Sequence, residues 1–164
     1  MKSRILNIDE APYQEWSHGE RYRARISWIG QQLDSRKLGF NVASVPPGKC
    51  VFPFHAHRGH EELFFILEGE GSIRIGEKVH SIRQGDFISL PPGRASAHQI
   101  INDSKAALRY LAVSTMESPE VVEYPESGKL GVFAGKPPGK APSDDSLRHF
   151  ARTGDGVGYW DGED

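Results

Sequence analysis

Cysteine and long apolar runs are the scarcest features of this sequence. Its 164 residues include one cysteine, Cys50, so the chain cannot carry an internal disulfide framework. No apolar run is long enough to cross a membrane, and residues 1–10 lack the apolar segment of a secretory signal. These absences argue against a disulfide-stapled secreted domain, and they predict a cytoplasmic protein with no membrane partner.

An excess of charge of either sign is missing as well. The 20 Lys and Arg residues nearly balance the 22 Asp and Glu residues, which leaves a formal net charge of −2. Such a chain has no general attraction for nucleic acid, and no helix-turn-helix pattern is present to bind it. We therefore expect a small-molecule partner and no nucleic acid. The length and a hydrophobic content of 37% suit one domain over residues 1–164.

Helical periodicity is also absent, because no stretch repeats apolar residues at helical spacing over three turns. The 18 glycines and 11 prolines instead separate short segments that are rich in β-branched and aromatic residues. This rhythm is typical of an all-β sandwich or barrel, with at most one or two short helical turns. The predicted strands are Tyr22–Ile29, Leu38–Val45, Val51–Ala56, Glu62–Leu67, Gly71–Ile75, Lys78–Ile82, Asp86–Leu90, Ser96–Asn102, Leu108–Thr115, Val121–Tyr124 and Leu130–Phe133.

Both ends of the chain differ in composition from the middle. Residues 135–145 are rich in glycine and proline and predict a loop, which opens a loop-rich C-terminal arm over residues 135–164. Aromatic residues in this arm are costly to leave in water, so we expect it to dock on the barrel or on a second subunit. The first twenty residues, with Tyr13 and Trp16, are expected to do the same.

Four residues could bind a divalent metal. His55 and His57 alternate along a strand-like segment, so both imidazoles would face the same side. A short turn can bring Glu62 back beside them, while His98 can join only if the fold brings it close. Imidazoles and a carboxylate suit Zn, Fe, Mn, Ni or Co. His60 lies in the same stretch and could replace a ligand, support one or face solvent.

These residues belong to two longer patterns. The first reads Gly48, six residues, His55-Ala56-His57, four residues, Glu62, six residues and Gly69. The second reads Gly85, five residues, Pro91-Pro92-Gly93, four residues, His98, three residues and Asn102. In this order, they resemble the two motifs of the cupin superfamily. The sequence departs from that family in a gap of six residues after Gly48, where five is usual, and in two extra residues before His98.

The resemblance covers residues 38–116 and implies a double-stranded β-helix, or jelly-roll, barrel over that range. It implies that His55, His57, Glu62 and His98 hold one divalent metal ion near the wider mouth of the barrel. It also implies a homodimer, since cupins commonly pair through their sheets. Taken as a whole, the chain looks like the small bacterial single-domain cupins that are loosely described as sugar-phosphate-isomerase-like.

Strand alternation from the proposed ligands predicts which side chains line a small apolar pocket. The lining residues expected from alternation are Phe64, Ile66, Ile75, Phe87 and Ile100. Arg94 joins them as a candidate to bind a substrate phosphate, because it lies on the loop leading to His98. Phe64 and Phe87 also fit ordinary core packing, and Arg94 also fits a solvated loop. The sequence shows no separate general base, since the metal would occupy Glu62.

Three functions remain open from the sequence. A metal-dependent enzyme could polarise a small carbonyl or hydroxylated compound, as in an isomerase or epimerase acting on a sugar phosphate. An Fe(II)-dependent dioxygenase would use the same ligands. A non-enzymatic module could bind a small ligand without turning it over.

Overall fold

The computed structural model of the chain describes residues 4–135 and 146–163, and the regular secondary structure in these ranges is almost all strand. The only helical elements described are α1 (Ile29–Gln32) and the 3-10 turn η1 (Arg94–Ser96). The strands are β1 (Gln14–His18), β2 (Tyr22–Ser27), β3 (Leu38–Val45), β4 (Lys49–Cys50), β5 (Ala56–His57), β6 (Glu62–Glu68), β7 (Glu70–Ile75), β8 (Lys78–Arg83), β9 (Phe87–Leu90), β10 (His98–Asn102), β11 (Leu108–Thr115), β12 (Glu120–Tyr124), β13 (Lys129–Ala134) and β14 (Leu147–Arg152). The all-β prediction is confirmed.

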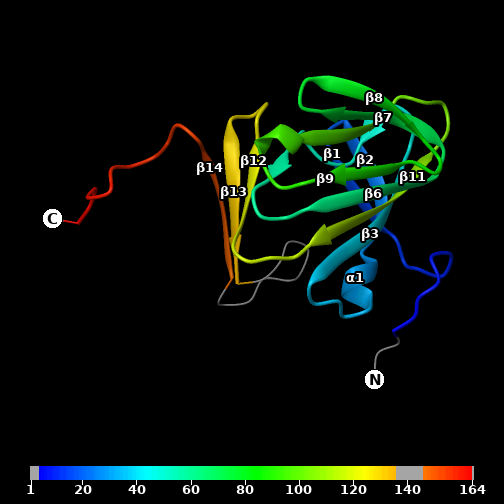
Figure 1. The fold of residues 1–164 in the computed structure, drawn as a ribbon, viewed down its shortest axis with the longest axis horizontal. Helices are drawn as coiled ribbons and strands as arrows, with labels where there is room; N and C mark the ends of the chain where they lie inside the picture. The colour runs from blue at the N-terminus through cyan, green and yellow to red at the C-terminus, as the bar shows by residue number, and fades with distance from the viewer. Residues whose placement is uncertain (1–3, 136–145, 164) are drawn as a thin grey trace.

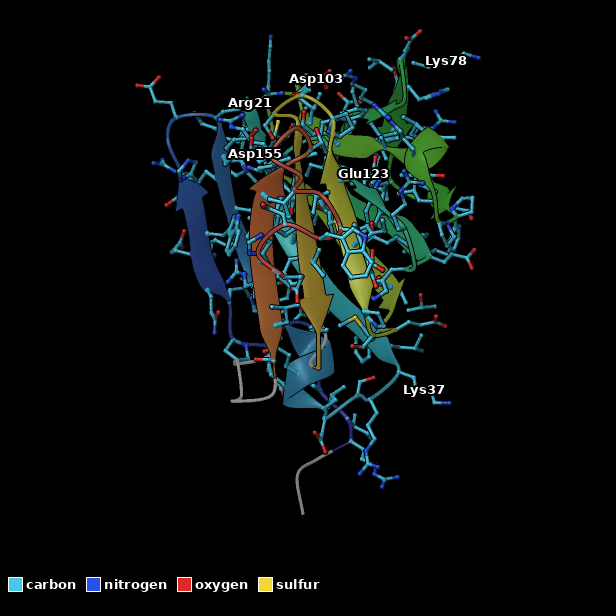
Figure 2. The ribbon with its side chains drawn as sticks, turned by 90° about the vertical axis from the view of Figure 1, so that its left-hand side faces the viewer. Arg21, Lys37, Lys78, Asp103, Glu123 and Asp155 are labelled. Carbon is cyan, nitrogen blue, oxygen red and sulfur yellow. The ribbon has the colours of Figure 1, made fainter. Side chains whose placement is uncertain are left out.

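The strands form two sheets of unequal size. The larger sheet has the order β8-β7-β10-β4-β2-β3-β11-β6-β9, with β1 paired to β2, and it curls into a barrel (Figure 1). The smaller sheet, β14-β13-β12-β5, stands at one side of that barrel. Figure 2 looks onto this smaller sheet, with the barrel strands behind it. Strand β5 contains His57, so the smaller sheet reaches the candidate site directly.

Strand alternation places the core inside the curl of the larger sheet. On β6, Phe64 and Ile66 are buried, whereas Leu63 and Phe65, which alternate with them, point outward. Fully burying such side chains contributes about 1.5–3 kcal/mol each. The same inward face collects the main cluster of buried residues, which are Ala24, Ile26, Ala43, Val45, Val51, Phe64, Ile66, Ile73, Ile82, Ile88, Leu90, Ile100, Leu108 and Tyr110.

The turn between β6 and β7 depends on Gly69. Its φ is +83°, a region that disfavours side chains. A Cβ added there would lie 2.4 Å from the carbonyl oxygen of Ala107. Glycine is therefore needed for both conformation and space, and it starts β7 in register with β10.

One predicted strand is wrong. Of the predicted segment Val51–Ala56, residues 51–55 are irregular between β4 and β5, and only Ala56 belongs to a strand, β5. Pro53 has no N–H for a ladder, and its carbonyl instead accepts a hydrogen bond from Nδ1 of His55 at 2.8 Å. Nε1 of Trp16 donates to the carbonyl of Val51 at 3.1 Å, so the N-terminal arm also satisfies this irregular backbone.

The two predicted arms both contribute a strand. The N-terminal arm forms β1, antiparallel to β2, and the C-terminal arm forms β14, antiparallel to β13. Residues after β14 run away from the barrel, and Tyr159 and Trp160 there are exposed (Figure 1). The predicted loop over residues 135–145 lies outside the described residues except for Gly135. Within the described part of the chain, no helix is long and apolar enough to cross a membrane.

Candidate metal centre

The barrel closes the gap of more than forty residues between His55 and His98. The two residues form an isolated antiparallel bridge, in which each backbone N–H donates to the other's carbonyl, at 3.1 and 2.8 Å. Their ring centroids lie 4.5 Å apart. The fold therefore brings the second predicted motif against the first, as a metal site built from both would require.

Glu62 lies at the centre of the cluster. Its Oε2 atom is 3.1 Å from Nε2 of His98 and 3.4 Å from Nε2 of His57. The ligating atoms of His55, Glu62 and His98 all lie within 4.8 Å of one another. All four predicted ligands thus meet in one place, with His57 reaching the group through its contact with Glu62.

Each of the three histidines has its Nδ1 atom tied to an oxygen. His55 contacts the carbonyl of Pro53 at 2.8 Å, and His98 contacts the carbonyl of Ser96 at 3.0 Å. Nδ1 of His57 lies 3.1 Å from Oε1 of Glu120. These acceptors favour a proton on Nδ1 and leave the Nε2 lone pair free to bind a metal.

Hydrogen-bond accounting indicates that a cation fits here. Oε2 of Glu62 and Nε2 of His98 are buried and have no hydrogen-bond partner. Leaving such atoms unsatisfied costs about 1–3 kcal/mol each, and more for a charged group. A divalent cation between them would satisfy both, so the residues present fit a metal.

A neighbouring cluster of His57, His60 and Glu120 differs in this respect. The Glu120 carboxylate already accepts hydrogen bonds from the backbone N–H groups of Arg58 and Gly59, at 3.1 and 2.9 Å. Nε2 of His60 contacts the Glu117 carbonyl at 2.8 Å. His60 is therefore a buried, hydrogen-bonded neighbour of the site.

The protonation states also suit a metal. Burial, together with repulsion from His98 and His57, lowers the pKa of His55 to about 3. Burial alone would raise the pKa of Glu62, but the imidazoles of His98, His57 and His55 lower it to about 2. His55 is thus neutral and Glu62 ionised near neutral pH, which are the forms that bind a metal ion.

A small cavity of about 20 Å³ adjoins two of the ligands. Phe64 and Ile100, two of the predicted lining residues, are among its walls. Ile66 is fully buried in the core, and Ile75 is paired with His98 across the sheet. Besides His55 and His98, the lining residues are Val51, Phe52, Phe64, Gln99, Ile100 and Tyr110.

Four of the six predicted pocket residues do not line this cavity: Ile66 and Ile75 pack in the core, whereas Phe87 and Arg94 lie at the surface. Phe87 is 71% exposed, because β9 pairs Phe87 with the outward Phe65 and pairs Ile88 with the inward Phe64. The side chain of Arg94 is 72% exposed, and its Nε atom lies 3.8 Å from Oε2 of Glu123 at the surface. The prediction that these four residues line the pocket is wrong.

Glu120 is a residue of this centre that the sequence does not predict. Glu120 directly follows the cis Ser118–Pro119 peptide and lies 63 residues from His57. No spacing in the sequence connects Glu120 with His57. Strand β12 brings them together by pairing with β5, so that Val122 lies opposite His57.

Comparisons with known proteins agree with the geometry. A family model of the cupin domain matches residues 41–114. An uncharacterized protein of Methanocaldococcus jannaschii is 32% identical over 91 residues, which cover 53% of this chain and 70% of that protein. An oxalate-binding protein of Thermotoga maritima is 35% identical over 74 residues, which cover 45% of this chain and 59% of that protein.

Solved structures show the same fold. A putative sugar phosphate isomerase of Acidithiobacillus ferrooxidans superposes with a TM-score of 0.76 at 22% identity, covering 93% of this chain and 94% of the other. A cupin-superfamily sugar phosphate isomerase of Silicibacter pomeroyi gives 0.76 at 19% identity, covering 91% and 92%. A predicted oxalate decarboxylase of T. maritima gives 0.59 at 24% identity, covering 68% and 97%.

The curled antiparallel barrel and its histidine–glutamate cluster define a double-stranded β-helix protein with a candidate metal centre. With the family match and the relatives above, the chain belongs to the cupin superfamily, as a small cupin-like protein.

Proposed function

We propose that this cupin is a metal-dependent enzyme that acts on a small carbonyl or hydroxylated compound, with isomerase or epimerase chemistry. The observation that carries the proposal is the pair of buried, unpartnered atoms on Glu62 and His98 beside a small cavity. His55, His57, Glu62 and His98 would hold one divalent ion, with Zn, Fe, Mn and Ni as candidates. When bound, the ion supplies Lewis-acid polarisation of a substrate oxygen.

The cavity limits what reaches the ligands. Its volume of about 20 Å³ holds roughly one water molecule, so it accepts a single small polar group. No lysine or arginine is among its lining residues. A sugar phosphate would therefore have to keep its phosphate outside this cavity, and we propose a small oxygen donor as the group that enters.

Tyr110 is the protic side chain on the cavity wall. It is buried, and burial raises the pKa of its phenol well above the usual range. The hydroxyl therefore stays protonated, and it can donate a hydrogen bond to an oxygen held beside His98. It cannot act as a general base in this form.

Binding without turnover is the second candidate function. Around the cavity, none of the described residues offers a free base, since Glu120 and His60 are already hydrogen-bonded. The T. maritima relative is named as an oxalate-binding protein, and oxalate is a small ligand that binds through its oxygen atoms. Both observations support the binding module as the alternative, because ligand binding needs no protein base.

The metal is tested first. Elemental analysis of the purified protein should find about one equivalent of divalent metal, and His57→Ala should remove most of it. His80→Ala is the matched control, because His80 is exposed on β8, and it should retain the metal. Unchanged metal content in His57→Ala would mean that the site is assigned wrongly.

The reaction is tested on the metal-loaded protein with a panel of small aldoses, ketoses and hydroxy acids, in air and without oxygen. Isomerisation that proceeds without oxygen supports the proposal. A reaction that requires oxygen would replace it with an Fe(II) dioxygenase. Stabilisation by a compound such as oxalate, with no product from any member of the panel, would replace it with a binding module.

We also propose that the protein is a homodimer. Outward residues on β9, β6 and β11 form a contiguous apolar patch, which we call the outer sheet patch: Phe87, Phe65, Leu63, Leu111 and Val113. The rings of Phe65 and Phe87 pack against each other at an interplanar angle of 34°, with centroids 4.4 Å apart. A patch of this kind on a sheet favours association with another protein surface.

A further inference from the structure

Glu120 is a buried carboxylate that faces the back of the candidate metal centre. It is 1% exposed and begins β12. Its Oε1 atom accepts hydrogen bonds from Nδ1 of His57 and from the backbone N–H of Arg58, both at 3.1 Å. Its Oε2 atom accepts one from the backbone N–H of Gly59 at 2.9 Å. A buried charge survives only with such partners, and this one is satisfied on both oxygens.

The contact with Glu120 sets His57 apart from the other two histidines. His55 and His98 each have Nδ1 against a neutral backbone carbonyl. Only His57 has Nδ1 against a carboxylate. A carboxylate on the far nitrogen of a metal-binding imidazole fixes its tautomer and ring orientation, and it makes the near nitrogen a stronger donor.

The surroundings hold this pair in place. A Cβ on Gly59 would lie 2.6 Å from Oε2 of Glu120, so the carboxylate occupies space that only glycine leaves open. His60 stacks against His57 with centroids 5.5 Å apart and an interplanar angle of 16°. The ring of His57 is therefore fixed at its edge by Glu120 and over its face by His60.

We propose that Glu120 is a positioning residue for the metal, acting through His57. It holds the His57 proton on Nδ1, directs Nε2 toward Glu62 and strengthens that nitrogen as a ligand. Glu62 and Glu120 also place two negative charges around three imidazoles, which suits a dication. The inference rests on the proposed metal site, and it assigns to β12, outside both cupin motifs, a part in metal binding.

The test compares Glu120→Gln with Glu123→Gln. Glu123 lies three residues further along β12 and pairs with Arg58 at the surface, so the control removes a carboxylate from the same strand without touching His57. Each folded protein is titrated with Co²⁺ against a competing chelator while the visible absorption of bound Co²⁺ is recorded. Glu120→Gln should weaken Co²⁺ binding about 10- to 100-fold and change the spectrum, and Glu123→Gln should do neither.

Equal affinities and superimposable spectra for wild type and Glu120→Gln would overturn the inference, even if the variant unfolds more easily. If wild type itself binds no Co²⁺, the proposed function fails, which is a different result. Should Glu120→Gln not fold, long-range ¹H–¹⁵N spectra of the chelator-treated wild type decide. The inference requires the neutral His57 ring to carry its proton on Nδ1, and a neutral ring protonated on Nε2 instead contradicts it.

Discussion

Oε2 of Glu62 lies 3.1 Å from Nε2 of His98, and neither of these buried atoms has a hydrogen-bond partner. Elsewhere around the centre, polar atoms are satisfied: Nδ1 of His98 contacts the Ser96 carbonyl, and the Glu120 carboxylate has three donors. Around the centre, the buried side-chain atoms that lack a partner are therefore the two at which the predicted ligands converge. A cation at that point should stabilise the fold as well as serve any reaction.

Metal should raise the thermal stability of the protein through this pair. A ligand at 100 times its Kd stabilises the folded state by about 2.7 kcal/mol, or roughly 5–10 °C in Tm for a chain of this size. Differential scanning calorimetry with and without Zn²⁺ measures the shift. Glu62→Gln should abolish it, whereas His80→Ala, on the exposed face of β8, should keep it. A full shift in Glu62→Gln would contradict the ligand assignment.

The metal-free protein should lose stability as the pH falls below about 6.5. In the fold the pKa of His55 is lowered from 6.5 to about 3, so between these values the unfolded chain binds a proton that the folded chain excludes. The pKa of Glu62 is lowered from 4.5 to about 2, so its stabilisation is present above about 4.5 and is lost as the pH falls toward 2. Both groups act in the same direction.

His57 acts in the opposite direction, but only at higher pH. Burial would lower its pKa, yet the hydrogen bond to Glu120 and the charge of Glu62 raise it above 6.5. Its stabilisation is complete below 6.5 and is lost as the pH rises through the raised value. Because His55 dominates below pH 6.5, the urea concentration at the unfolding midpoint of the metal-free protein should decrease as the pH is lowered from about 6.5 to 4.5. The His55→Gln variant should show a smaller decrease. A wild-type midpoint that does not move would show that His55 is not buried in its neutral form.

Much of the barrel and the grouping of His55, His57 and Glu62 could be predicted from local spacing and turn residues, whereas only the resemblance to the second cupin motif places His98 with them. His55 and His57 share a face by simple alternation, and Gly69 marks a turn that no other residue fits as well. The position of Glu120 could not be predicted in this way. It depends on which strand pairs with β5, and that pairing spans more than sixty residues with no periodic signal.

Phe87 shows a second limit of the sequence. Alternation fixes which residues share a face, but the face itself depends on where the strand begins. The sequence is compatible with Phe87 on either face of the sheet. In the fold, Ile88 pairs with the inward Phe64, so Phe87 points outward. Similarly, Val51–Ala56 has the composition of a strand. However, Pro53 lacks an N–H for strand pairing, and its carbonyl accepts a hydrogen bond from the His55 side chain instead of from a neighbouring strand.

Gly69→Ala should destabilise the fold more than Gly85→Ala. Both glycines have positive φ, +83° and +93°, so both substitutions cost about 1–2 kcal/mol for conformation. At Gly69 the new Cβ would also meet the Ala107 carbonyl oxygen at 2.4 Å, whereas nothing lies within 4 Å at Gly85. Displacing that backbone adds about 1–3 kcal/mol. Urea unfolding of the two variants measures the difference, and equal midpoints would mean that the β6–β7 turn relaxes freely.

Phe87→Lys should convert the proposed dimer into monomers. Phe87 is 71% exposed and packs against Phe65 in the outer sheet patch, so a charge there would have to be buried without a partner if two copies associate through this face. Val79→Lys is the matched control, because Val79 is 63% exposed on β8, away from the patch. Sedimentation equilibrium of wild type and both variants gives the oligomeric state. A dimer that survives Phe87→Lys but dissociates with Val79→Lys would place the interface at β8 instead of at the outer sheet patch. A monomeric wild type would contradict the proposed dimer.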